Sequence, residues 1–280
     1  MTSATVTPAV PPVVPPVAEA PSRPPRRPFA TLRAIMSLVL REMATSYGRS
    51  PGGYAWAILE PVGGIAVLSI VFSAMFRAPP LGSSFAMFYA TGILPFMMFT
   101  DVQGKMSQAL LYSRPLLAYP TVTYIDALLA RFVLNVLTQI MVSFIVLAAC
   151  IWLFEPMSHP SVPIIIEAFA LAALLALGMG TLNCFLSTLF PIYLQIWSIM
   201  MRPMFVLAGL MFLYDAVPQP YQGWLWWNPL IHVVGLARKG FYSTYQAEYA
   251  SSFYVVLFSL IALMIGLVFL RRYHRDLLTL

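Results

Sequence analysis

Charged residues are scarce in this chain of 280 residues. Asp, Glu, Lys and Arg make up 9% of it and hydrophobic residues 60%, whereas a soluble domain carries about 25% charged residues. This shortage excludes an ordinary soluble domain. Six apolar segments are long enough to cross a bilayer, which takes about 20 residues each. The composition therefore predicts an all-α integral membrane protein with six transmembrane helices.

Residues that supply metal, disulfide or nucleophilic chemistry are equally sparse. The two cysteines, Cys150 and Cys184, both lie in apolar segments and offer no disulfide framework or metal spacing. The three histidines are far apart, and neither His-Glu-x-x-His nor Gly-x-Ser-x-Gly occurs. We therefore expect no catalytic residue and no metal ligand in this chain.

The chain also lacks a nucleotide-binding loop. Its two lysines are Lys105 and Lys239, and Gly104-Lys105 is followed by Met106, with Phe99 where a Walker A motif has its first glycine. That motif needs its lysine and backbone amides to cradle phosphate. No cofactor is therefore predicted in this chain, and any ATP and Mg²⁺ would be bound by a partner ATPase.

The N-terminal part divides into a tail and an amphipathic segment. The first 28 residues contain nine prolines and no uninterrupted apolar core, which predicts a disordered cytoplasmic tail over 1–28 rather than a cleaved signal. Apolar residues then recur at helical spacing, which predicts an interface helix within 29–50, lying on the inner membrane surface. Residues 51–280 are the predicted transmembrane domain.

Turn residues and charges divide this domain into spans. An uncharged run of 34 residues, 168–201, exceeds one crossing, and Leu189-Phe190-Pro191-Ile192 is its expected turn. The predicted spans are Tyr54–Phe76, Phe85–Thr100, Ile125–Phe154, Ile164–Leu189, Tyr193–Leu213 and Phe253–Leu270.

An aromatic-rich segment, 214–252, precedes the last span. Its run from Gly223 to Pro229 resembles a short helix ended by a turn, and an apolar run continues to Gly240. Two short re-entrant outer helices would explain this pattern, and an interfacial belt of Trp and Tyr is the alternative.

The basic residues are distributed unevenly about these spans. With six crossings, 11 of the 16 Lys and Arg residues lie inside and three lie outside, namely Arg77, Arg238 and Lys239. This asymmetry predicts that both termini are cytoplasmic. The net charge of +6 therefore sets orientation, and we expect no nucleic-acid partner.

Five ionisable residues lie within or near the spans: Glu60, Asp126, Arg131, Glu167 and Arg202. All but Arg202 lie near a span end, where snorkelling or a structural ion pair is the simpler interpretation. Arg202 lies near mid-depth, where a lone charge is costly. We therefore expect Arg202 to line a polar cavity or to pair with an acid.

Three stretches carry a resemblance to a known family. They are Leu40-Arg41-Glu42 with Tyr47-Gly48-Arg49 and Leu59-Glu60-Pro61, then Ser113-Arg114-Pro115-Leu116-Leu117-Ala118-Tyr119-Pro120 followed by Asp126 and Arg131, and Trp227-Asn228-Pro229-Leu230 with His232 and Arg238. Through them, the chain resembles the membrane subunit of an ABC type-2 exporter over about residues 29–275. It is most similar to the capsule polysaccharide export permeases of Gram-negative bacterial inner membranes.

The resemblance implies a homodimeric channel in the inner membrane with two cytoplasmic ATPase subunits. It would translocate a lipid-linked polysaccharide to periplasmic and outer-membrane export proteins. A coupling helix would contact the ATPase through Gln108, Arg114, Pro115, Leu116, Leu117 and Tyr119. Polar and aromatic surfaces for the sliding glycan would come from Tyr54, Tyr89, Tyr193, Gln195, Trp197, Arg202 and Trp227.

Other functions remain open from the sequence. The substrate could be another glycan, such as O-antigen or teichoic acid, or a small drug. An integral-membrane enzyme acting on lipid or glycan would need a cluster of acids, histidines or metal ligands at one surface. An ion-coupled carrier would need paired midplane charges and an internal repeat.

Overall fold

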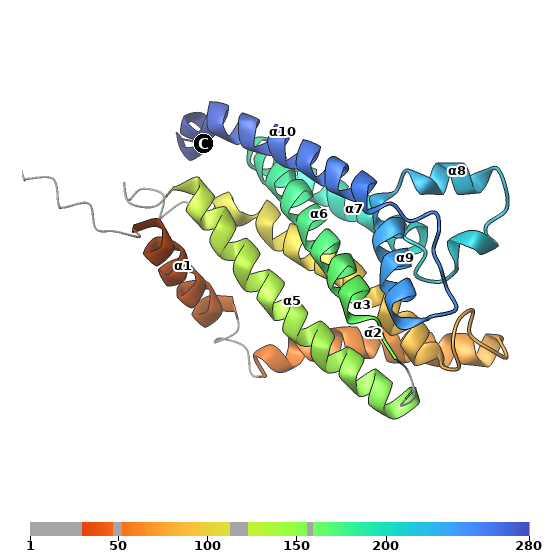
Figure 1. Cartoon of the computed structure of the whole chain (residues 1–280). Coiled ribbons are helices and arrows are strands. Elements are labelled where there is room, and N and C mark those ends of the chain that lie inside the picture. Colours follow the sequence, from red (N-terminus) through yellow and green to blue (C-terminus); the bar gives the residue numbers. More distant parts are fainter. Residues whose placement is uncertain (1–29, 47–51, 113–122, 156–158, 280) are drawn as a thin grey trace, which may run out of the picture. The chain divides into compact units, whose positions relative to one another are not determined.

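The computed structural model describes residues 30–46, 52–112, 123–155 and 159–279, and in these ranges it contains helices and no strand (Figure 1). The predicted all-α fold is thus confirmed for this part of the chain. Five of its helices are long and apolar enough to cross a membrane. They are α2 (Tyr54–Met75), α3 (Phe85–Ser107), α5 (Tyr124–Phe154), α6 (Val162–Leu189) and α10 (Ser252–Thr279).

The predicted fifth span is a shorter helix than expected. It corresponds to α7 (Tyr193–Leu207), whose 15 residues rise about 22 Å, less than the roughly 30 Å of a hydrocarbon core. The expected end near Leu213 is wrong, because Gly209 adopts a left-handed φ of 75°. Six full-length spans are therefore not confirmed in the described residues.

Helix α6 lies at the centre of the packing. It packs most extensively against α3 and α10, and α3 in turn packs against α5 and α2. A Cβ on Gly178 would lie 2.3 Å from the Ser259 carbonyl oxygen, and one on Gly266 would lie 2.7 Å from the Leu182 nitrogen. Small residues of this kind let transmembrane helices approach closely, so these glycines set the α6–α10 distance.

Shorter helices occupy two other predicted segments. The segment predicted to lie on the membrane surface forms α1 (Ala30–Ser46), with Met36 and Leu40 exposed; its position at the membrane stays a prediction. The aromatic segment contains a short 3-10 turn, η1 (Tyr214–Ala216), followed by α8 (Tyr221–Trp226) and α9 (Pro229–Phe241). Helix α9 begins where the Asn228 side chain accepts a hydrogen bond from the Leu230 amide, as an N-cap residue does. The predicted tail, 1–28, lies outside the described residues.

Candidate functional site

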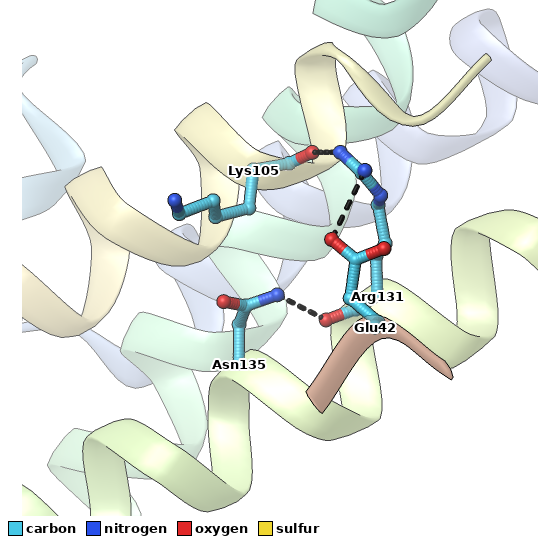
Figure 2. Close-up of polar contacts among 4 residues, drawn as sticks. All are labelled: Glu42, Lys105, Arg131 and Asn135. Atoms are coloured by element: carbon cyan, nitrogen blue, oxygen red, sulfur yellow. Dashed lines mark hydrogen bonds and ion pairs between the residues drawn. The ribbon is translucent and has the colours of Figure 1, made fainter. Parts of the chain in front are cut away.

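Arg131 lies where α1, α3 and α5 meet (Figure 2). Its Nη2 atom is 3.0 Å from Oε1 of Glu42 on α1, and its Nη1 donates a 3.0 Å hydrogen bond to the Lys105 carbonyl on α3. Its guanidinium also lies over the ring of Tyr112, 5.0 Å from the centroid. One side chain, only 7% exposed, therefore connects three segments of the chain; we call these four residues the Arg131 cluster.

The start of α5 fixes this side chain in place. Thr123 and Asp126 form a capping box, in which each side chain bonds to the other residue's backbone amide. Asn135, one turn beyond Arg131, donates a 2.7 Å hydrogen bond to the Arg131 carbonyl (Figure 2). Arg131 thus projects from the second turn of a long helix. Its ion pair with Glu42 agrees with the sequence-based interpretation of a structural ion pair.

A second polar group lies beside this cluster. Gln139 of α5 donates a hydrogen bond through Nε2 to Asp101 of α3. Glu60 of α2 and Lys105 of α3 lie close enough for their charges to act on Asp101. Asp101 thus has a hydrogen-bond partner on a neighbouring helix, and α3 continues through Asp101 and Lys105 to Ser107 instead of ending near Thr100 as the sequence predicted. The charges of α2, α3 and α5 thus gather toward the α1 end of the bundle.

The Arg131 cluster borders the segment predicted to contact an ATPase. Gln108 caps the end of α3, and residues 109–112 continue in helical conformation up to Tyr112. The other predicted coupling residues lie outside the described part: Arg114, Pro115, Leu116, Leu117 and Tyr119. Their role stays a prediction. Of the described residues on either side of them, Tyr112 contacts Arg131, and Thr123 caps the helix that carries Arg131.

The predicted glycan-path residues lie in different environments. Tyr193 and Trp197 of α7 stack with ring centroids 6.1 Å apart, while Arg202 is exposed on the same helix. Trp227, after α8, is 69% exposed. Tyr89 is only 1% exposed and packs against Phe72 and Phe88.

Of the remaining path residues, Gln195 is exposed on α7 and Tyr54 begins α2, with its side chain outside the described part. The structure therefore groups Tyr193, Gln195, Trp197 and Arg202 on one helix. It does not bring Tyr89 to the surface with them. Whether any of these residues contacts substrate stays a prediction.

Two buried side-chain amides that face α7 were not predicted from the sequence. Tyr193 donates its hydroxyl to Oδ1 of Asn183 on α6, at 2.7 Å, and Trp197 donates Nε1 to Oε1 of Gln103 on α3, at 3.1 Å. Asn183 is fully buried and Gln103 is 2% exposed. The available signal was an uncharged amide inside an otherwise apolar span, which marks a hydrogen bond between membrane helices.

Arg238 was counted among the basic residues outside the membrane, and the structure buries it. Its guanidinium donates to the carbonyls of Gly209, Leu210 and Phe212 at 2.7–2.9 Å and lies 4.2 Å from the centroid of the Phe88 ring. Burial lowers the pKa of Arg238 to about 10, so it remains charged at neutral pH. Helix α9 thereby holds the segment that follows α7.

Comparisons with known proteins agree on one family. Residues 33–242 match the family model described as ABC-2 type transporter. The chain is 30% identical to the polysialic acid transport protein KpsM of Escherichia coli over 88% of this chain and 95% of that protein. It is also similar to two capsule polysaccharide export inner-membrane proteins: CtrC of Neisseria meningitidis serogroup A, 24% identical, and BexB of Haemophilus influenzae, 25% identical, each over 87% of this chain and 92% of the relative.

Proposed function

Because this chain belongs to the ABC-2 type transporter family, we propose that it is the membrane subunit of an ATP-driven exporter that carries a lipid-linked capsular polysaccharide across the inner membrane. The observation that carries this proposal is similarity along nearly the whole chain to proteins named for polysialic acid transport and capsule export. Polysialic acid bears a carboxylate on each sugar, so an acidic polymer is the favoured substrate class.

The energy for this export would come from a partner. This chain, as a member of the family, is a transport subunit rather than an enzyme, and its sequence contains no Walker A motif. ATP and Mg²⁺ would therefore be bound by two cytoplasmic ATPase subunits. They would contact the segment between Gln108 and Thr123, with both termini of this chain on the same cytoplasmic side.

The Arg131 cluster supplies a route by which ATPase movement reaches the membrane helices. Displacement of the coupling segment would move Tyr112 at one end and the capped start of α5 at the other. Arg131 contacts Tyr112, Glu42 and the Lys105 carbonyl together. Helices α1, α3 and α5 would therefore respond together rather than one at a time.

Two copies of the chain would form the channel. Most of α2 is exposed, and α7 contains no buried residue, so the surfaces of both helices must be covered by lipid, glycan or a second copy. Periplasmic and outer-membrane export proteins would receive the polymer. Another glycan, such as O-antigen, would use the same architecture and is the alternative substrate.

Affinity purification of the chain from native membranes in mild detergent tests this proposal. We expect a stoichiometric ATPase subunit that contains a Walker A motif, and a periplasmic export protein recovered with it. A chain that purifies alone as a stable monomer would contradict the proposal and favour a membrane enzyme or an ion-coupled carrier.

A further inference from the structure

Helix α7 is attached to the bundle through aromatic side chains on one of its faces. Tyr193 and Trp197, four residues apart, donate hydrogen bonds to the buried amides of Asn183 and Gln103. No residue of α7 is itself buried, and its backbone contacts with α6 are sparse. The two hydrogen bonds therefore help to fix the rotation of α7 about its own axis, together with the contact of Phe205 with Phe96, because breaking them would leave buried amide groups unpaired.

A second face of α7 carries its exposed polar side chains, beside the apolar Ile199 and Val206. Gln195, Ser198 and Arg202 are spaced three and four residues apart, so they share one edge of the helix. All three are exposed, and the Ser198 hydroxyl donates to the Gln195 carbonyl. We call these three residues the polar edge of α7.

The other exposed positions of α7 are all apolar. They are Ile196, Ile199, Met200, Pro203, Val206 and Leu207. Apolar positions of this kind suit lipid or the surface of another helix. The polar edge does not, because a guanidinium facing hydrocarbon is costly, and Arg202 has no ion pair with any residue that the structure describes. The polar edge therefore needs water or a polar ligand beside it.

The chemistry of the polar edge suits an acidic glycan. A guanidinium binds a carboxylate through two parallel hydrogen bonds, and the amide of Gln195 and the hydroxyl of Ser198 can exchange hydrogen bonds with sugar hydroxyls. These three groups lie about 4.5 and 6 Å apart along the helix axis, so they can contact different parts of one extended chain. A single cation among neutral groups attracts an acidic chain without holding it as tightly as a basic cluster would.

We propose that the polar edge is the surface of this chain that contacts the acidic polymer, and that Tyr193 and Trp197 are positioning residues that hold this edge toward the polymer. The identity of the ligand rests on the proposed function, whereas the contact of the edge with water does not. Tyr193 and Trp197 thus act through Asn183 and Gln103 rather than by stacking on sugars.

Thiol labelling in membrane vesicles tests the polar edge. In a chain with Cys150→Ala and Cys184→Ala, Ser198→Cys places a thiol on the polar edge, and Ile196→Cys places the matched control on the apolar side. We expect a water-soluble anionic methanethiosulfonate to label Cys at 198 at least about tenfold faster than at 196, because ionised thiols and charged reagents both require water. Equal rates, or labelling of 198 by a lipophilic maleimide alone, would overturn the proposal in favour of lipid contact.

Arg202 should make this labelling depend on charge. The anionic reagent should react with Cys at 198 about threefold or more faster than its cationic analogue, and Arg202→Gln should remove this preference, because a nearby cation concentrates anions. Polygalacturonate oligomers should slow the labelling more than dextran oligomers of equal length. Equal effects of the two polymers would contradict the acidic-glycan contact. Because this assay needs neither ATP nor a partner, its result is separable from that of the export proposal.

The positioning role has its own measurement. Tyr193→Phe combined with Trp197→Phe keeps aromatic rings but removes both hydrogen bonds. We expect this pair to reduce the difference in labelling between positions 198 and 196, with the chain still inserted and monodisperse in detergent. Gln103→Glu, which retains an acceptor for Trp197, should preserve the difference better than Gln103→Leu. An unchanged labelling pattern in the double variant would overturn the positioning role.

Discussion

Two arginines are buried in the described part of the chain, and each has different acceptors. Arg131 pairs with a carboxylate from another helix and one carbonyl, whereas Arg238 donates to three backbone carbonyls. A side-chain carboxylate on a surface helix can move away and return, but the carbonyls of a folded segment cannot be exchanged without unfolding it. Arg131 is therefore suited to transmitting movement, and Arg238 to maintaining a fixed structure.

Replacing Arg131 should separate ATP hydrolysis from transport. Arg131→Met removes the ion pair with Glu42 and the bond to Lys105, each a charge-assisted interaction of about 1.5–3 kcal/mol. We expect export per ATP hydrolysed to fall roughly tenfold or more, with a smaller loss for Glu42→Gln, which leaves the carbonyl bond intact. Transport and phosphate release would be measured together in vesicles containing the partner ATPase. Arg77→Met, an exposed arginine, is the control, and equal coupling in all variants would contradict a role for Arg131.

Replacing Arg238 should destabilise the fold itself. Arg238→Met leaves two buried carbonyls, of Gly209 and Leu210, and the half-buried carbonyl of Phe212 without donors, at about 1–3 kcal/mol for each buried group. Arg238→Lys should recover part of the loss, because an ammonium cannot match the planar fork of a guanidinium. Thermal unfolding in detergent measures both variants against Lys239→Met, the neighbouring cation. A melting temperature for Arg238→Met equal to that of Lys239→Met would show that the three bonds contribute little.

Single residues were predictable from sequence where a charge made them conspicuous. Arg131 and Arg202 stood out because charges are rare in these spans. Gln103 and Asn183 did not, because an uncharged amide gives no sign of which distant residue it pairs with. Arg238 gave no sign of burial either, since its acceptors are backbone carbonyls, which every residue has.

Among the helices, the contact of α6 with α10 depends on glycine. Gly178→Ala places a methyl group 2.3 Å from the Ser259 carbonyl oxygen, so α10 must shift outward and the packing must loosen. We expect this variant to lower the melting temperature in detergent by several degrees, the equivalent of about 1–3 kcal/mol. Gly104→Ala is the matched control, because nothing lies within 4 Å of the added carbon. Similar melting temperatures for the two variants would contradict the close approach of these helices.

The junction of α8, α9 and α10 should be sensitive to acid through His232. The Ser251 amide donates to Nδ1 of His232, so the other ring nitrogen, Nε2, carries the proton and donates to the Trp226 carbonyl. Burial lowers the pKa of His232, which means that the folded state resists protonation. As the pH falls below about 6.5, the unfolded state gains a proton that the folded state does not, and stability is lost.

Thermal unfolding at pH 7.5 and pH 5.5 measures this dependence. The parent chain should lose stability at the lower pH, and His232→Gln should lose less, although it starts from a lower melting temperature. The same drop in both chains would assign the acid sensitivity to other groups.

The elements were predictable to the extent that local sequence decides them. Apolar periodicity and the Pro and Gly turns located α1, α2, α5 and α6 within a few residues, and the start of α10 within one residue, although α10 continues nine residues beyond the predicted Leu270. The end of α7 was missed because Gly209 turns the chain and a distant arginine, Arg238, binds the carbonyls that follow the helix. The end of α3 was missed because Asp101 has a hydrogen-bond partner on another helix, Gln139, which makes a polar residue tolerable there.

At the scale of the whole molecule, α2 and α7 leave surfaces that lipid, glycan or a second copy of the chain must cover. Helix α6, packed against α3 on one side and α10 on another, forms the centre of the packing, while α2 and α7 keep largely exposed surfaces. The Arg131 cluster would connect this centre to an ATPase, and the polar edge of α7 would connect it to the polymer. Export would then require partner proteins. The sequence predicted them only through its resemblance to a transporter family and through its lack of a nucleotide-binding loop.

Deletion of the gene in its native host tests the central claim most directly. The measurement is the amount of lipid-linked polysaccharide inside the cell and on its surface. The account predicts that the polymer is still made and accumulates in the cytoplasm, with surface polymer restored by the parent chain but much less by Arg131→Met. Loss of the polymer from both compartments would indicate a biosynthetic enzyme, and normal surface polymer would show that this chain does not export it.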